Sequence, residues 1–80
     1  MPLNTLISKN LRRLMANHGH SHNLQSLSHL IFEKTKVHVD PTTIGRILNK
    51  EVTPTLDTLS RIAEALDQDL REFFRPDNDK

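Results

Sequence analysis

Apolar residues recur every three or four positions in several separate stretches of this chain, which is the spacing of one buried helix face. These stretches predict helices over about residues 5–17, 23–34, 41–49 and 56–66. The segments between them are polar and contain Gly19 and Pro54, residue types that end helices and form turns. Strand-type alternation is absent, so the pattern predicts an all-α fold.

Short polar residues stand where the predicted helices begin. Asp40 can cap free backbone N–H groups, and Pro41 suits the first helical position that follows. Asn23 is the corresponding cap of the second helix, and Asp69 can cap a short fifth helix over 70–74. The sequence therefore predicts a bundle of five helices.

The helix that begins after Asp40 has an unusual outer face. Its apolar residues Ile44, Ile47 and Leu48 fall at i, i+3 and i+4, on one narrow side. The other side carries only small or hydrogen-bonding residues, namely Thr42, Thr43, Gly45, Arg46 and Asn49. A helix that is thin and polar on one side, with one long donor, can lie in the major groove of DNA.

Two successive segments carry the sequences TTIGRILNK (42–50) and PTLDTLSRIAEAL (54–66). They resemble the third helix, the following loop and the fourth helix of the phage-repressor/Cro-type (lambda-repressor-like, XRE-like) helix-turn-helix family. Residues 10–19 and 70–74 are similar to its first and last helices. The resemblance implies a five-helix lambda-repressor-like DNA-binding domain over residues 1–75, followed by a polar C-terminal tail over 76–80.

The chain departs from the family pattern in two places. The spacing from Asn23 to Thr42 is about six residues longer than is usual in the family. We assign these extra residues to an extended helix 2 and turn within 31–38. The family often pairs an Arg in its first helix with a Glu in its third, whereas Met15 and Leu48 stand at those positions. A buried ion pair can be exchanged for packed apolar groups at little loss of stability, so we interpret this as a substituted contact.

The charges are distributed unevenly, although the net charge is only +1. Residues 1–50 hold seven Lys and Arg against two acids, a net charge of +5. Residues 51–80 hold four Lys and Arg against eight acids, a net charge of −4, and all five histidines lie in the first half. Such a molecule would turn its N-terminal half toward a polyanion.

Together, the helix face and the resemblance indicate which residues would meet DNA. Arg46 can bind guanine O6 and N7, although a phosphate contact or a solvated side chain is also open to it. Thr42 and Thr43 could equally be ordinary first-turn residues, and Gly45 could serve helix packing instead of close approach to DNA. The predicted base-reading residues are Thr42, Thr43, Gly45 and Arg46. The predicted phosphate contacts are Arg12, Gln25, Ser26, Asn49, Lys50 and Thr53.

Other chemistry is poorly supported. His18, His20 and His22 alternate in a loop and imidazole is a zinc ligand, but no carboxylate or cysteine accompanies them, so we expect no metal and no cofactor. A milder alternative is that histidine protonation near about pH 6.5 strengthens DNA binding. No catalytic arrangement stands out, which argues against an enzyme and a small-molecule substrate. No apolar run suits a signal peptide or a membrane span, so we expect a cytoplasmic protein in a bacterial or phage-infected cell.

These observations predict a sequence-specific transcriptional regulator of the Cro/repressor type, whose helix over 41–49 reads a double-stranded DNA operator. One small domain reads few base pairs, so we expect a homodimer, at least on DNA. Leu70 and Phe74 are the predicted dimer contacts. The alternative is a protein–protein interaction module of antitoxin type, for which Phe74 and Val52 would be the exposed apolar candidates.

Overall fold

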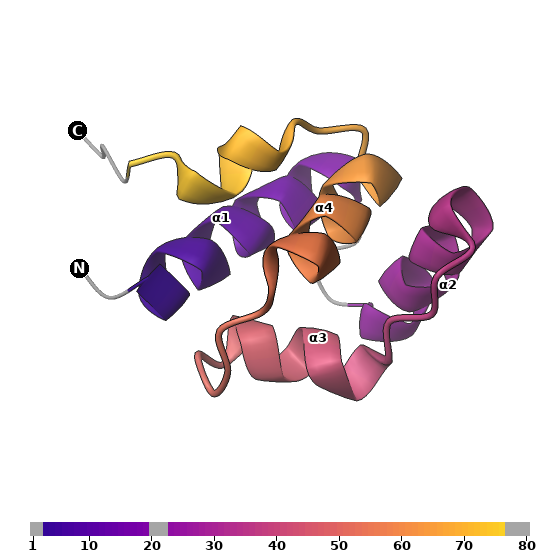
Figure 1. Ribbon diagram of the computed structural model, residues 1–80, viewed down its shortest axis with the longest axis horizontal. Coiled ribbons are helices and arrows are strands. Elements are labelled where there is room, and N and C mark those ends of the chain that lie inside the picture. Colours follow the sequence, from indigo (N-terminus) through magenta and orange to yellow (C-terminus); the bar gives the residue numbers. More distant parts are fainter. Residues whose placement is uncertain (1–2, 20–22, 77–80) are drawn as a thin grey trace.

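The computed structural model describes residues 3–19 and 23–76, which form only helices and connections, with no strand among them (Figure 1). In chain order the elements are α1 (Leu3–His18), α2 (Leu24–Thr35), α3 (Pro41–Leu48), α4 (Leu56–Ala65) and η1 (Leu70–Phe74). The all-α prediction is confirmed. Of the predicted tail over 76–80, residues 77–80 lie outside the described part of the chain.

The predicted short fifth helix, whose type the sequence did not predict, is a 3-10 helix of five residues, η1. Its backbone N–H of Glu72 bonds to the carbonyl of Asp69, three residues earlier, at 2.9 Å. The segment has no room to lengthen into an α-helix, because Pro76 follows closely and cannot donate a backbone hydrogen bond. The bundle therefore consists of four α-helices and one 3-10 helix within the described residues.

The three predicted helix caps are confirmed. Asp40 accepts a hydrogen bond from the Thr42 amide at 2.8 Å, Asn23 from the Ser26 amide at 2.9 Å, and Asp69 from the Arg71 amide at 2.9 Å. Each cap satisfies an N–H group that has no partner within its own helix. The sequence thus determines where α2, α3 and η1 begin.

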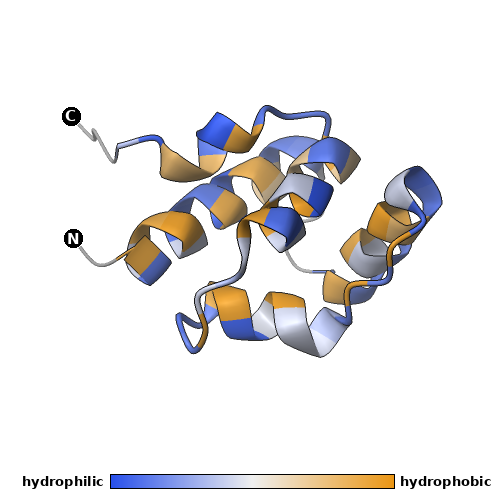
Figure 2. Ribbon diagram, in the orientation of Figure 1, coloured by the Kyte–Doolittle hydropathy of each residue, from blue (hydrophilic) through white to orange (hydrophobic). Residues whose placement is uncertain are grey.

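The helices enclose one apolar core. The largest fully buried side chain is that of Phe73, and it is joined there by leucine and isoleucine from all four α-helices. Figure 2 shows the side of α3 that faces the other helices in hydrophobic colours and its outer side in polar ones. Met15 and Leu48 are both buried in this core, at 0% and 8% exposure, and their direct contact stays a prediction.

Helix α2 occupies much of the segment to which we assigned the extra residues. It has 12 residues and ends at Thr35, and its cap Lys36 adopts a left-handed conformation with φ 63°. An extended connection over 36–40 then leads to α3. In the pair of helices that would meet DNA, α2 is therefore longer than in a tight helix-turn-helix, and the turn that joins it to α3 is longer as well.

Candidate nucleic-acid interface

The outer face of α3 collects most of the predicted base-reading residues. Thr42, Thr43, Arg46 and Asn49 are all exposed. At 3.6 residues per turn they fall within an arc of about 120°, whereas Ile44, Ile47 and Leu48 point into the core. The helix thus presents one continuous polar strip, which we call the α3 face (Thr42, Thr43, Arg46 and Asn49).

Arg46 differs from most arginines of this protein in having no acidic partner among the described residues. Arg61 lies 3.5 Å from Asp57, and Arg71 lies 3.1 Å from Asp69. Because its guanidinium has no carboxylate to neutralise it, Arg46 retains its full positive charge and its five donors for an external acceptor.

Gly45 lies beside α2 and is only partly exposed. A Cβ atom at this position would stand 3.2 Å from Leu24 Cδ1, which is closer than most real contacts of this kind. The packing of α3 against α2 is therefore close here, and a Cβ atom would require the end of the Leu24 side chain to shift by a few tenths of an ångström. Of the two explanations that the sequence left open, the geometry supports helix packing, and a base contact by Gly45 stays a prediction.

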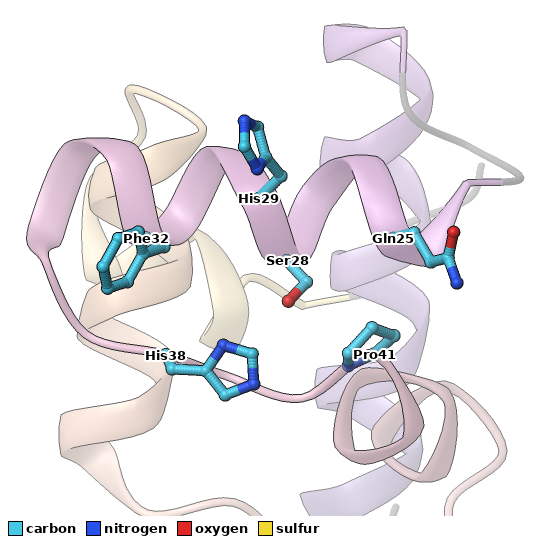
Figure 3. A pocket seen from close by; sticks show the side chains of 6 residues that line it. All are labelled: Gln25, Ser28, His29, Phe32, His38 and Pro41. Atoms are coloured by element: carbon cyan, nitrogen blue, oxygen red, sulfur yellow. The ribbon is translucent and has the colours of Figure 1, made fainter.

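The first turn of α2 carries two predicted phosphate contacts, Gln25 and Ser26. Gln25 is exposed, whereas Ser26 is half-buried and its amide is bound by the cap Asn23. Gln25 also stands at one end of an open groove of about 310 Å³ between α2 and the connection to α3 (Figure 3). The groove is lined by Gln25, Ser28, His29, Phe32, His38 and Pro41. Gln25 and Pro41 thus bring the beginnings of α2 and α3 to the same groove.

The other end of α3 gathers a second set of predicted phosphate contacts. Asn49 caps the helix and Lys50 follows in a left-handed conformation with φ 64°. The Arg12 guanidinium of α1 donates to the Leu48 carbonyl at 3.4 Å, so Arg12 stands at this same end. Thr53 is exposed in the loop that follows. The structure therefore brings Arg12 and Lys50 near one another, although 38 residues separate them in sequence.

Sequence reasoning missed the row of α1 side chains that binds this end of α3. Asn4 Nδ2 donates to the Lys50 carbonyl at 2.9 Å, and Ser8 Oγ donates to the Leu48 carbonyl at 2.6 Å. With Arg12 they stand at i, i+4 and i+8 of α1, a spacing that places them on one helix face. That spacing alone could not have revealed the contact, because polar residues repeated along a helix beside its apolar stripe usually form a solvated face.

The predicted dimer residues lie on a different part of the bundle. In Figure 1, η1 and α3 lie at opposite edges, with α1 and α4 between them. Leu70 and Phe74 are half-buried and pack partly against the core, so the expectation that Phe74 is exposed was wrong. The large apolar side chains that are exposed among the described residues are Leu3, Phe32, Val52 and Leu56. Both outer apolar side chains of η1 thus lie partly against the core beside Phe73.

The histidine hypothesis falls largely outside the described residues, because His20 and His22 are not among them. Within the described ranges, no three His, Cys, Asp or Glu side chains gather in a way that could hold a metal ion. In the same part of the chain, no helix has the length and apolar character needed to cross a bilayer.

The family comparison agrees with this geometry. A helix-turn-helix family model matches residues 34–73, from the last turn of α2 through α3 and α4 into η1. Among curated proteins and among solved structures, no significant match was found. Because the match covers half of the 80 residues, the chain belongs to the Cro/C1-type (XRE-like) helix-turn-helix family, which is DNA-binding and non-enzymatic.

Proposed function

We propose that this protein is a sequence-specific DNA-binding regulator of transcription, and that α3 enters the major groove of an operator. The observation that carries the proposal is the α3 face, where Arg46 has no acidic partner among the described residues. Thr42 and Thr43 stand in the first turn of α3, the part of a recognition helix that usually meets base edges. Bound at an operator, the protein would block or recruit the polymerase.

Phosphate contacts on both sides of the α3 face would hold the helix in register. Gln25 and Ser26 would bind one phosphate at the first turn of α2, where the helix dipole favours an anion. Arg12, Asn49, Lys50 and Thr53 would bind the backbone at the opposite end of α3. This division assigns sequence reading to α3 and affinity to the residues around it.

Selection of bound sites from a random pool of DNA duplexes tests the proposal. We expect one enriched sequence, and an affinity for it that exceeds the affinity for random duplex by at least about a thousandfold. Binding to both should weaken as salt rises, because the protein displaces counterions from the phosphates. Equal affinity for all duplexes, or binding that ignores salt, would contradict the proposed function.

We also infer that two copies bind one operator, since a single domain of this size specifies few base pairs. Leu70 and Phe74 remain the proposed contacts, with Arg71 and Arg75 at the rim; their half-buried positions leave only a small apolar area for a partner. A small interface favours a dimer that is weak in solution and completed on DNA. Sedimentation with a palindromic duplex tests it: two chains per duplex are expected, and a strict one-to-one complex would exclude the dimer.

A protein-binding module of antitoxin type is the alternative function. The exposed side chains of Phe32 and Leu56, at 47% and 63% exposure, are its support in the structure. Because Phe32 belongs to α2 and Leu56 to α4, a partner protein would have to contact both helices to cover the two side chains. Weak binding to every DNA duplex at low salt, without any enriched sequence, would favour this alternative.

A further inference from the structure

Two buried serines hold the two ends of α3. Ser8 of α1 is 1% exposed, and its hydroxyl donates to the Leu48 carbonyl at the last residue of α3, at 2.6 Å. Ser28 of α2 is 5% exposed, and its hydroxyl donates to the Val39 carbonyl just before the cap of α3, at 2.5 Å. Figure 3 shows the Ser28 hydroxyl directed toward the connection that leads into α3.

The Leu48 carbonyl depends on α1 for its hydrogen bonds. The other three carbonyls of the last turn of α3 are satisfied within the chain segment itself: those of Gly45, Arg46 and Ile47 accept from the amides of Asn49, Glu51 and Lys50. Among the described residues, the Leu48 carbonyl is left with the Ser8 hydroxyl and the more distant Arg12 guanidinium. A buried carbonyl without a partner is costly, so this end of α3 is bound to α1 at a defined point.

Hydrogen bonds fix direction in a way that apolar packing does not. The core contacts of Ile44, Ile47 and Leu48 hold α3 against the bundle, but the hydrophobic effect is non-directional and would tolerate some rotation or sliding of so short a helix. Hydrogen bonds lose strength steeply with small changes in distance and angle. Two of them, one at each end and to different helices, define the line along which α3 lies.

We propose that Ser8 and Ser28 are positioning residues that set the orientation of α3 and thereby the sequence specificity of the protein. Neither serine would touch DNA. Each would act through the backbone of α3, because the contacts of Thr42 and Arg46 with base edges require the helix to be placed within a few tenths of an ångström. This inference rests on the proposed function, since it concerns how that function becomes selective.

The experiment compares Ser8→Ala and Ser28→Ala with Ser60→Ala, which removes the same hydroxyl from an exposed position in α4. Two quantities are measured at a temperature at which circular dichroism shows each variant folded. The first is the ratio of affinities for the selected site and for random duplex. The second is the set of residual dipolar couplings of the α3 amides in the free protein, relative to those of α1 and α4.

We expect Ser8→Ala and Ser28→Ala each to lower the affinity ratio by about tenfold, the equivalent of one base contact, with little change in binding to random duplex. Their α3 couplings should change as a group, whereas Ser60→Ala should leave both quantities as in the wild type. If either alanine variant fails to fold, Ser8→Cys or Ser28→Cys replaces it, because a thiol of similar size is a much weaker donor.

Unchanged couplings and an unchanged ratio in both folded variants would overturn the proposal, and so would a rotated α3 that keeps its full selectivity. A loss of affinity equal for all duplexes would show that the serines serve stability or phosphate binding alone, which also overturns it. If the wild type has no preferred sequence, the proposed function fails by itself. The couplings of the free protein then decide whether the serines orient α3.

Discussion

The arginines of the C-terminal region and the arginine of α3 differ in whether an acidic side chain pairs with them. Arg61, Arg71 and Arg75 lie within 3.5 Å of the carboxylates of Asp57, Asp69 and Glu72 respectively. Arg46 is equally on the surface, yet no carboxylate pairs with it within the described residues. Exposed ion pairs add little to stability, so the C-terminal pairs matter more for cancelling charge than for stability.

Under the proposed function, this difference is what would let a protein of net charge +1 present positive charge to DNA. Charge is neutralised locally where arginines meet acids and is left uncompensated around α3, so a polyanion approaches one side of the molecule. The C-terminal region then has the role of a scaffold that covers the core. Four substitutions test this division of labour.

The largest effect, a loss of folding stability, is expected from Phe73→Ala in the C-terminal region. Phe73 is fully buried, and its carbonyl also accepts a hydrogen bond from Asn10 of α1 at 2.8 Å. Removing a buried phenyl ring costs about 3–5 kcal/mol, which is a large part of the stability of so small a domain. Urea unfolding should show a much lower midpoint than for the wild type.

Phe74→Ala is the matched control, since Phe74 adjoins Phe73 in η1 but is only half-buried. Its stability should fall by distinctly less than that of Phe73→Ala. Equal losses for the two variants would mean that both rings belong to the core, and of the two proposed dimer contacts only Leu70 would then be left for a partner.

The second effect concerns the α3 face directly. We expect Arg46→Ala to reduce discrimination at one operator base pair by about 1–3 kcal/mol, because a guanidinium that binds guanine in a bidentate way is lost. Arg61→Ala is the control, since this arginine has its charge compensated by Asp57. Competition binding with operator variants measures the effect. An equal loss of affinity for specific and random DNA would make Arg46 a phosphate contact.

A third, smaller effect separates phosphate binding from sequence reading. Lys50→Ala should lower the slope of log affinity against log salt by about 0.9, the contribution of one phosphate contact, and leave the preferred sequence unchanged. Lys34→Ala removes a lysine whose ammonium group is already bound to Asp67 at 3.0 Å, so its slope should stay near that of the wild type. A similar change in both variants would mean that overall charge alone determines the slope.

The sequence predicted the elements well because local chemistry decides them. Asn23, Asp40 and Asp69 each cap the helix they precede, and the apolar spacing of Ile44, Ile47 and Leu48 determines which side of α3 is buried. The same spacing determines which residues of α3 are exposed. The face that carries the proposed function could therefore be deduced from the order of residues alone.

What the sequence could not supply were contacts between distant segments. Ser8 lies 40 residues from Leu48, and an isolated serine in a helix is usually a solvated one. The position of Gly45 against Leu24 also depends on how two helices cross. The sequence also predicted a fifth helix over 70–74 without its type, and the structure has a 3-10 helix there.

The smallest effect is expected at Asp69, within the acidic region. The side-chain hydrogen bond from Arg71 lowers the pKa of the Asp69 carboxyl below its ordinary value of 3.8, and the backbone N–H of Arg71 adds to this. A carboxyl whose pKa is lowered by folding stabilises the folded state above its unfolded pKa, and that contribution is lost as the pH falls through the folded value. Asp69→Asn should therefore lower the melting temperature slightly at neutral pH, with a difference that shrinks below pH 3.8.

Titration of the Asp69 carboxyl carbon by NMR, in the wild type and in Arg71→Ala, tests the cause of this shift. Removing the guanidinium should raise the pKa of Asp69 only part of the way to its ordinary value, because the amide at position 71 still donates to the carboxylate. A pKa that returns completely to the ordinary value would mean that the Arg71 side chain alone lowers it. An unchanged pKa would mean that the Asp69–Arg71 side-chain pair does not form in solution. In the second case Arg71 would carry its charge as freely as Arg46, and the contrast between the two regions would rest on Arg61 and Arg75 alone.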